Sequence, residues 1–226
     1  MDYGKDRDWP FAEGGESTIF VATGGWLTAV LLHKLKPNWF TKLILAIDTF
    51  LWLAVLYFFR DPNRTVVDEP GLVIGPGDGE VVEIHHETEE RYLQEEVIRI
   101  SMFLDVTDVH VQRVPLGGTV TVVDHQPGNY LQAFRPEASQ VNEFVAMVTE
   151  SEYGRVLIKQ IAGILARRCV NYLEPGTIVQ TGQRFGLIKF SSRLDLFLPT
   201  DAHLLVQVGD KVVGGVTPIA QLTPHQ

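Results

Sequence analysis

Residues 182–199, GQRFGLIKFSSRLDLFLP, combine glycines with short apolar runs. They belong to a region, beginning near residue 65, that indicates short β-strands separated by glycine and proline. The clearest of the expected strands are rich in β-branched residues and are bounded by turn-forming residues: Gly79–Ile84, Val97–Leu104, Gly118–Val123 and Arg155–Ile161. This pattern predicts a β-rich domain.

Three segments of that region, at 75–81, 175–183 and 208–215, set glycines a few residues apart around short β segments. Such turns recur in barrel-sandwich folds of the lipoyl and biotinyl type, although glycine-rich turns also occur in many other all-β proteins. We therefore expect an α+β chain, mostly β, whose β-rich domain is a barrel-sandwich. One helix is expected within the domain, near 136–148.

Two apolar runs, Ile19–Leu32 and Leu43–Phe59, precede this region and are joined by a basic and aromatic connector at 33–42. A transmembrane helix needs about 20 apolar residues; the first run is short and the second contains Asp48. The pair fits either a helical hairpin that enters or crosses a membrane or two helices lying in the headgroup region. Aromatic residues suited to a membrane boundary favour membrane association over burial in a soluble domain: Trp26, Trp39, Trp52 and Tyr57.

The chain changes character at Arg60–Arg64, where Pro, Asp and Asn end the second apolar run. We expect a polar arm at 1–16, a membrane-associated helical pair at 17–60 and the β-rich domain at 61–226. Basic side chains cluster around the apolar runs: Lys34, Lys36, Lys42, Arg60 and Arg64. If the hairpin spans, its basic connector indicates a cytoplasmic loop. No signal peptide is evident, so we expect the β-rich domain on the cytoplasmic side of the cell membrane, held peripherally or by the hairpin.

Composition excludes several other classes of protein. The chain has 226 residues and a formal net charge of −9, which makes it a poor candidate for binding nucleic acid. Its single cysteine, Cys169, can form neither an internal disulfide nor a zinc site alone, and we expect it to be a small buried residue. His85 and His86 have poor metal-ligand spacing, and the charged run at 87–96 is interpreted as a solvated loop or hairpin edge. The sequence implies no metal.

The stretch at 182–199 resembles the C-terminal signature of the short-form phosphatidylserine decarboxylases. That signature is a Gly-x-x-Phe-Gly turn and a strand, followed by Gly-Ser-Arg and a strand ending in Leu-Pro. Other segments resemble further motifs of the family, in the family's order, at 58–62, 76–79, 103–115 and 160–168. The N-terminal apolar pair is also a family feature, so the resemblance covers the chain from about residue 19 to about residue 200.

The resemblance implies a proenzyme that cuts itself between Ser191 and Ser192. In the family, the serine hydroxyl attacks the preceding carbonyl to give an ester, elimination leaves dehydroalanine, and hydrolysis leaves a pyruvoyl group at the new N-terminus. That ketone condenses with the substrate amine and acts as an electron sink for the loss of carbon dioxide. The implied cofactor is a pyruvoyl group derived from Ser192, and the cleaved α and β chains are each other's partners.

Ser191 stands where the family has glycine. Glycine allows the strained torsions that help a serine hydroxyl reach the preceding carbonyl, and serine makes that geometry costlier. The acyl shift uses the carbonyl of Ser191, however, and its side chain is a bystander. Two interpretations stay open: a self-processing decarboxylase, or a non-processing, membrane-tethered lipid-binding relative without catalysis.

Two residues receive catalytic roles from the resemblance. Asp78 matches the aspartate of the family's Pro-x-Asp-Gly turn, and His110 matches the histidine of its Asp-x-His segment. As an acid–base pair they would polarise Ser192 and later supply the proton that replaces the carboxylate. In longer relatives a second histidine follows three residues on, where this chain has Arg113. The alternatives are a turn aspartate and a hydrogen-bonded core or edge histidine.

Arg167 and Arg168 are candidates for binding the lipid phosphate, because a guanidinium pairs well with phosphate oxygens. On a strand the two would point to opposite faces, so only one would bind; a surface ion pair is the alternative. The implied reaction converts phosphatidylserine, or a related lipid such as archaetidylserine, to the ethanolamine lipid. The expected partners are this phospholipid and the membrane surface, and the oligomeric state stays open, a homo-oligomer included.

Overall fold

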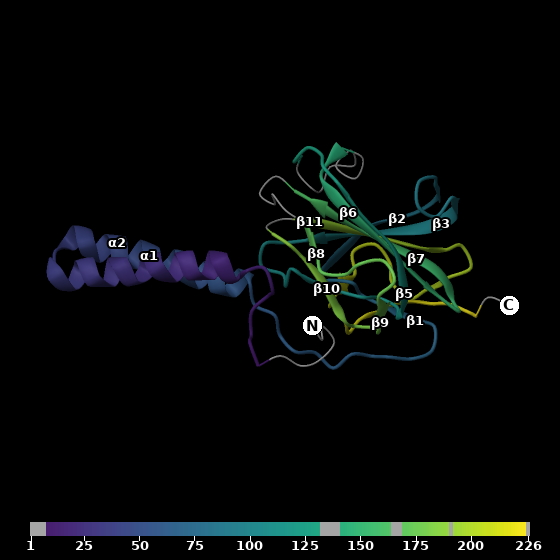
Figure 1. Cartoon of the computed structure of the whole chain (residues 1–226), viewed down its shortest axis with the longest axis horizontal. Helices are drawn as coiled ribbons and strands as arrows, with labels where there is room; N and C mark the ends of the chain where they lie inside the picture. The colour runs from purple at the N-terminus through teal and green to yellow at the C-terminus, as the bar shows by residue number, and fades with distance from the viewer. Residues whose placement is uncertain (1–7, 132–140, 164–168, 190–191, 225–226) are drawn as a thin grey trace. The chain divides into compact units, whose positions relative to one another are not determined.

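The computed structural model describes residues 8–131, 141–163, 169–189 and 192–224, and of Ser192 it describes the backbone (Figure 1). These residues form two compact units, a hairpin unit that ends at Pro62 and a β unit that begins at Asn63. The hairpin unit contains the helices α1 (Glu16–Leu35) and α2 (Trp39–Phe58), and every strand of the β unit follows them. The predicted class, α+β with mostly β structure, is confirmed.

The turn between the two helices is fixed by a capping box. The side-chain oxygen of Asn38 accepts hydrogen bonds from the backbone nitrogens of Phe40 and Thr41, both at 3.0 Å. The Thr41 hydroxyl accepts one from the Asn38 nitrogen in return. Two of the donors that the first turn of α2 leaves unpaired are thereby satisfied, and the helix begins at a defined residue.

Aromatic and hydroxyl side chains join the two helices. Trp26 of α1 stacks on Trp52 of α2 with the ring centroids 4.7 Å apart. The Trp26 indole nitrogen donates to Thr49, and that of Trp52 donates to Thr23, so both N–H groups are satisfied within the hairpin. Each helix has 20 residues and is long and apolar enough to cross a membrane by length and composition.

The β unit is built from short strands bounded by glycine-rich and proline-containing turns. In chain order they are β1 (Leu72–Ile74), β2 (Gly79–Glu89), β3 (Glu95–Leu104), β4 (Val111–Arg113), β5 (Gly118–Gln126), β6 (Phe144–Ser151), β7 (Gly154–Ala162), β8 (Cys169–Asn171), β9 (Ile178–Val179), β10 (Arg184–Ile188), β11 (Ser192–Pro199), β12 (His203–Leu204), β13 (Lys211–Val212) and β14 (Pro218–Gln221). The four strands predicted from sequence are confirmed as β2, β3, β5 and β7.

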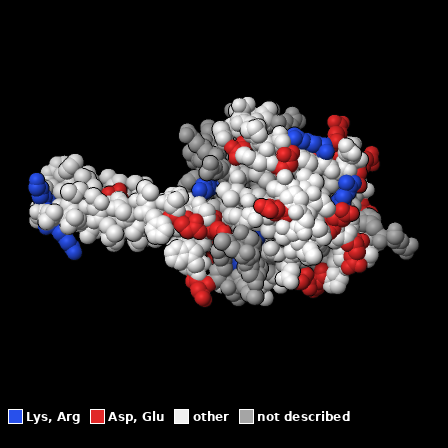
Figure 2. All heavy atoms as spheres, in the orientation of Figure 1, with Lys and Arg blue, Asp and Glu red and all other residues white. Residues whose placement is uncertain are grey.

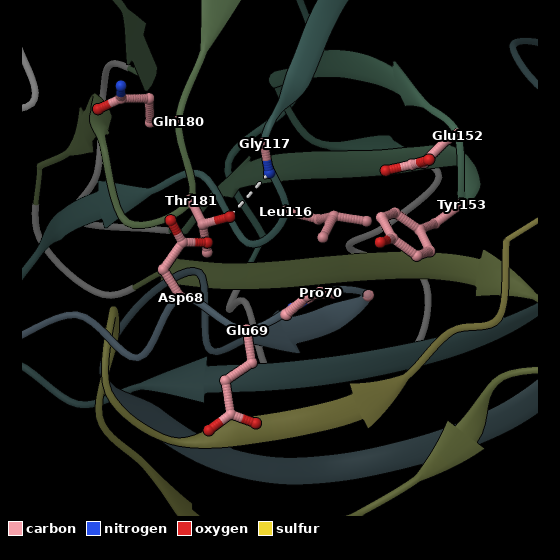
Figure 3. Close-up of a pocket in the computed structure, with 10 residues that line it drawn as sticks. Asp68, Glu69, Pro70, Leu116, Gly117, Glu152, Tyr153, Gln180 and Thr181 are labelled. Atoms are coloured by element: carbon pink, nitrogen blue, oxygen red, sulfur yellow. Dashed lines mark hydrogen bonds between the residues drawn. The ribbon is translucent and has the colours of Figure 1, made fainter.

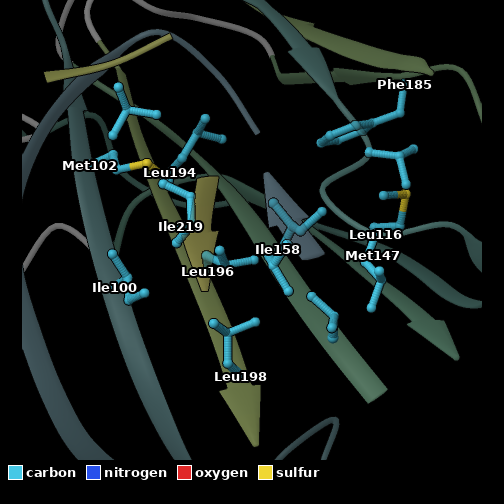
Figure 4. Packing of buried hydrophobic residues seen from close by; sticks show 14 of the residues in the cluster. Ile100, Met102, Leu116, Met147, Ile158, Phe185, Leu194, Leu196, Leu198 and Ile219 are labelled. Carbon is cyan, nitrogen blue, oxygen red and sulfur yellow. The ribbon is translucent and has the colours of Figure 1, made fainter. Parts of the chain in front are cut away.

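The strands form antiparallel sheets around a main apolar core, and a smaller apolar cluster includes Val97, Leu157 and Phe197. The largest sheet has the order β13-β2-β3-β11-β7-β6-β5-β9 and curls strongly into a half-barrel (Figure 1). Two smaller sheets have the orders β4-β10-β8 and β1-β14-β12. From central β11, Leu194, Leu196 and Leu198 point into the core, where Phe185 of β10 and Ile219 of β14 join them (Figure 4). The alternation along β11 follows from the two-residue period of a strand.

Two expectations about local structure hold only in part. The helix expected near 136–148 is wrong for Phe144 to Val148, which belong to β6; Val141 is helical, and residues 136–140 lie outside the described part of the chain. The charged run at 87–96 does form a hairpin edge, but it is not uniformly solvated. Glu89 at the end of β2 is only 5% exposed, because it accepts hydrogen bonds from Lys159 and from the backbone of Tyr92 and Leu93.

Candidate active site

Ser192, the predicted cleavage residue, is the first residue of β11 in the middle of the large sheet. Its backbone pairs with Leu104, the last residue of β3, and with Ala162, the last residue of β7. The segments that follow β3 and β7 therefore leave the sheet at the end where β11 enters it. The segment after β3 carries His110, and the segment after β7 carries the candidate arginines Arg167 and Arg168. These two arginines and Ser191 lie outside the described residues.

His110 is fully buried directly before β4. Its carbonyl accepts a hydrogen bond from the backbone nitrogen of Ile188, the last residue of β10, at 3.3 Å. Its Nδ1 lies 2.9 Å from the carbonyl oxygen of Asp108. Because a carbonyl oxygen only accepts, Nδ1 carries the hydrogen, and in the neutral ring the proton-accepting lone pair belongs to Nε2.

Asp78 lies in the predicted Pro-Gly-Asp-Gly turn before β2 and is bound by Arg64. The guanidinium donates two hydrogen bonds to the carboxylate, Nη1 to Oδ1 at 2.5 Å and Nη2 to Oδ2 at 2.8 Å. The backbone nitrogens of Gly214 and Val109 also donate to this carboxylate, at 2.9 and 3.4 Å. The turn is thus tied to the residue before His110, and Arg64, which the sequence placed with the basic residues around the apolar runs, belongs to this site.

Asp108 adds a carboxyl group with an altered proton affinity to the same loop. Burial raises its pKa, the hydrogen bond from the Asp105 nitrogen opposes that effect, and the negative charge of Asp78 raises the pKa further. Asp78 and Asp108 thus add two carboxyl groups to the segments around His110, one paired with Arg64 and one with a raised pKa.

Arg113, at the place of a second histidine in longer relatives, is buried and joins the three glycine-rich segments. Its side chain donates to the carbonyl of Gly182 at 3.0 Å, and its backbone nitrogen donates to that of Pro76 at 2.8 Å. It also packs on Gly215, where an added Cβ would lie 2.7 Å from the arginine Cδ. The arginine therefore holds these turns together, a role that the sequence motif did not indicate.

Arg193, next to Ser192, lies in a buried cluster of charges on the sheet face opposite the main core. It donates to Asp195 at 2.7 Å, to Glu83 at 3.0 Å and to the Ser101 hydroxyl at 2.8 Å. Burial lowers the pKa of Arg193, but the charges of Asp195 and Glu83 outweigh burial and raise it. The strand that follows the predicted cut is thereby fixed on one side of the sheet by the charged guanidinium of its second residue.

Glu143 is buried beside the end of β7 and is bonded to two more exposed side chains. Its carbonyl accepts a hydrogen bond from Ala162, and its carboxylate is bonded to the hydroxyl of Tyr130 at 2.6 Å and to Nε2 of His125 at 3.1 Å. Burial raises the pKa of Glu143, but the hydrogen bonds from Tyr130 and His125 outweigh it and lower the pKa. The glutamate remains ionised and ties the segment between β5 and β6 to the Ser192 end of the sheet.

A pocket of about 490 Å³ lies elsewhere in the β unit (Figure 3). It is lined by three carboxylates, those of Asp68, Glu69 and Glu152, and by Tyr153 in the turn before β7. Ser192 pairs with the opposite end of β7, about 27 Å along the strand at the usual rise per residue. An acidic pocket at that end is a poor place for an anionic headgroup, so we do not assign it to the site.

The single cysteine is packed inside the β unit. Cys169 is buried in β8, as predicted, and burial raises the pKa of its thiol. Among the described residues, no three His, Cys, Asp or Glu side chains are grouped so that they could hold a metal ion.

Comparison with known proteins shows the family to which the chain belongs. The phosphatidylserine decarboxylase family model matches residues 51–220. Similar proteins, each called a phosphatidylserine decarboxylase proenzyme, come from Desulfotalea psychrophila (41% identical, covering 77% of this chain and 84% of the relative), Symbiobacterium thermophilum (40%, covering 89% and 95%) and Carboxydothermus hydrogenoformans (40%, covering 92% and 98%). These matches define the class of enzyme, a carboxy-lyase of phospholipid biosynthesis. The chain belongs to the phosphatidylserine decarboxylase family, which confirms the resemblance in its sequence.

Proposed function

We propose that the chain is a proenzyme that cuts itself between Ser191 and Ser192 and then decarboxylates phosphatidylserine. The observation that carries the proposal is the position of Ser192 at the end of a central strand, beside the segment that holds buried His110. The hydrogen bond from Ile188 to the His110 carbonyl ties the strand before the cut to that segment. The relatives are named proenzymes, which supports self-processing.

In this proposal His110 moves the protons. With Nδ1 donating to the Asp108 carbonyl, Nε2 accepts the proton of the Ser192 hydroxyl as the oxygen attacks the Ser191 carbonyl. The ring returns this proton to the Ser192 nitrogen as the peptide bond breaks. In the later decarboxylation, a protonated ring delivers a proton to the carbon that loses the carboxylate. Asp78 supports the positive ring electrostatically, and its pairing with Arg64 keeps the turn in place.

The pyruvoyl group derived from Ser192 would supply the carbonyl that withdraws electrons from the bond being broken. The residues present fit such a group, because β11 is hydrogen-bonded to β3 on one side and to β7 on the other. Arg193 adds its bonds to Glu83 and Ser101, which lie in the other fragment. These contacts would keep the fragment 192–226 in place after the cut.

The substrate is proposed to be a phospholipid with a serine headgroup, either phosphatidylserine or the ether-linked archaetidylserine. Arg167 and Arg168 follow Ala162, which pairs with Ser192, so either arginine is near enough in sequence to bind the lipid phosphate. The proposed architecture of the β unit is a barrel-sandwich. Arg113, which contacts all three glycine-rich segments, supports it.

The hairpin unit is proposed to hold the enzyme at the cytoplasmic face of the cell membrane. Lys34, Lys36 and Lys42 are exposed at the turn between the helices, where Figure 2 shows basic side chains at the end of the hairpin. A hairpin that crossed the membrane would place this turn on the side opposite the β unit. The turn and the β unit can both be cytoplasmic only if the helices lie in, or dip into, the cytoplasmic leaflet.

Decarboxylation is tested with vesicles that contain phosphatidylserine labelled at the serine carboxyl. Wild type should release labelled carbon dioxide and form the ethanolamine lipid, and Ser192→Ala should release none. Ser151→Ala is the matched control and should retain activity, because Ser151 ends β6 and pairs with Gly154, at the end of β7 away from Ser192. An active Ser192→Ala variant, or an inactive wild type, would contradict the proposal. The latter result favours the non-processing lipid-binding relative, which Ser191 in place of glycine makes the second candidate.

A further inference from the structure

Two glutamines lie in the otherwise apolar interior between the large sheet and the β4-β10-β8 sheet. Gln112 of β4 is fully buried, and Gln160 of β7 is 1% exposed. Gln160 is opposite Leu194 in the strand register, and Leu194 belongs to the main core. A buried amide is costly unless it is hydrogen-bonded, so a specific role is expected of this pair.

The glutamines form a directed chain of hydrogen bonds that ends at His110. Nε2 of Gln160 donates to Oε1 of Gln112 at 2.9 Å and to the carbonyl of Val170 at 3.3 Å. Nε2 of Gln112 donates to the carbonyl of His110 at 2.6 Å. Because Nε2 of Gln160 faces two acceptors, the orientation of its amide is fixed, and it fixes that of Gln112 in turn.

The backbone of His110 is thereby held from both neighbouring elements. Its carbonyl accepts one hydrogen bond from Ile188 of β10 and one from Gln112, which uses both lone pairs of the oxygen. The ring is held separately, through Nδ1 and the Asp108 carbonyl. The chain of amides connects this histidine to β7, the strand that also pairs with Ser192.

We propose that Gln112 is a positioning residue for His110 and that Gln160 orients Gln112. This inference rests on the proposed function, in which His110 moves the protons. Net stabilisation by a buried hydrogen-bonded pair is small, because its partners can be replaced together by apolar groups at little cost. Removing one partner instead leaves a buried polar group unpaired. Stability and positioning are therefore separable by mutation.

The test compares Gln160→Met, Gln112→Met and the double variant. Gln160→Met leaves Oε1 of Gln112 without its donor, so the thermal midpoint should fall by several degrees. The double variant removes both amides, so its midpoint should recover toward that of wild type. The first-order rate of self-cleavage, followed by intact mass, should nevertheless be at least about tenfold lower in the double variant than in wild type. A small displacement of a catalytic group is enough to lower a rate by that factor.

A second readout is taken from chains that have been cut. The kcat for decarboxylation, normalised to the number of cleaved chains, should fall, while KM should stay within about twofold because Gln112 does not touch the substrate. Ile158→Val, a buried substitution on the same face of β7, is the matched control. It should lower the midpoint slightly and leave the cleavage rate unchanged.

A double variant that cleaves at the wild-type rate overturns the inference. If the double variant does not fold, the two single variants decide, since Gln112→Met should cleave more slowly than Gln160→Met at a similar midpoint. Equal rates would again overturn the inference. His110→Ala is measured in parallel. If it cleaves and decarboxylates normally, the proposed function of His110 is wrong, whereas an inactive His110→Ala beside a normal double variant refutes only the role of the glutamines.

Discussion

Gly186 of β10 occupies a position with no room for a side chain. An added Cβ would lie 2.4 Å from the Val170 carbonyl oxygen and 2.6 Å from Nε2 of Gln160. The Val170 oxygen belongs to the paired strand β8, and the Gln160 amide is fixed by its own hydrogen bonds, so neither can yield cheaply. The glycine of the Gly-x-x-Phe-Gly motif is therefore required by the close approach of a strand and an amide.

Gly186→Ala should lower the free energy of unfolding by about 1–3 kcal/mol, because the extra methyl group overfills a packed interior. Urea unfolding followed by fluorescence measures this change. Gly24→Ala is the control, since Gly24 in α1 has nothing within 4 Å of an added Cβ. It should leave the β unit unchanged. A Gly186→Ala variant as stable as wild type would show that the backbone at this position moves freely.

The motifs in the sequence pointed to the candidate site residues but not to their partners. Ser192 and His110 were found through local patterns, and the structure places them on segments that meet at one end of the sheet. The bonds from Arg64 to Asp78 and from Arg193 to Glu83 join residues that are distant in sequence. No local pattern encodes such pairs, because they depend on the register and curl of the sheet.

At the scale of elements, strands were predictable where β-branched residues lie between turn-forming residues. The helix expected at 136–148 was wrong over Phe144–Val148, where Ala146 and Met147 are good helix formers. These residues pair with β5 and β7 in the centre of the large sheet, and Val145 and Val148 are buried there. Tertiary pairing outweighs the helix propensity of a short segment.

The hairpin formed by β2 and β3 depends on the charge of Glu89. Burial raises the pKa of Glu89, but the hydrogen bonds from Lys159 and from the backbone of Leu93 and Tyr92 outweigh it and lower the pKa below its ordinary value of 4.5. The ionised carboxylate therefore stabilises the folded state above that value. This contribution is lost as the pH falls through the folded-state pKa.

Glu89→Gln should be about 1–3 kcal/mol less stable than wild type near neutral pH, because Lys159 loses a charged partner in a buried setting. The difference between the two proteins should shrink as the pH falls below 4.5, because wild-type Glu89 is protonated as the pH passes through its lowered pKa. Thermal midpoints measured across this range test the prediction. Glu90→Gln changes an exposed neighbour and should follow wild type throughout. A constant difference at every pH would show that the charge of Glu89 does not stabilise the fold.

At the scale of the whole molecule, the two units differ in their apolar side chains. The hairpin unit exposes many of its large apolar side chains, whereas the β unit buries most of its own. Phe20 of α1 and Phe50 of α2 are 69% and 71% exposed. Changing both to Asp should weaken binding to phospholipid vesicles by at least about tenfold, since a carboxylate among lipid chains costs a few kcal/mol. Vesicle co-sedimentation measures the bound fraction.

Ile178→Asp is the control for this experiment, because Ile178 of β9 is 80% exposed but belongs to the β unit. Its binding should equal that of wild type. Unchanged binding of the double Asp variant would mean that the exposed surfaces of α1 and α2 do not hold the protein at the membrane.

Self-cleavage before Ser192 is tested by intact mass spectrometry of wild type beside Ser192→Ala. Wild type should give two fragments, residues 1–191 and 192–226, and the smaller should resist Edman degradation because its N-terminus carries a pyruvoyl group. Ser192→Ala should remain one chain. A single uncut wild-type chain, even after incubation with membranes, would contradict the claim and identify the protein as a relative that does not process itself.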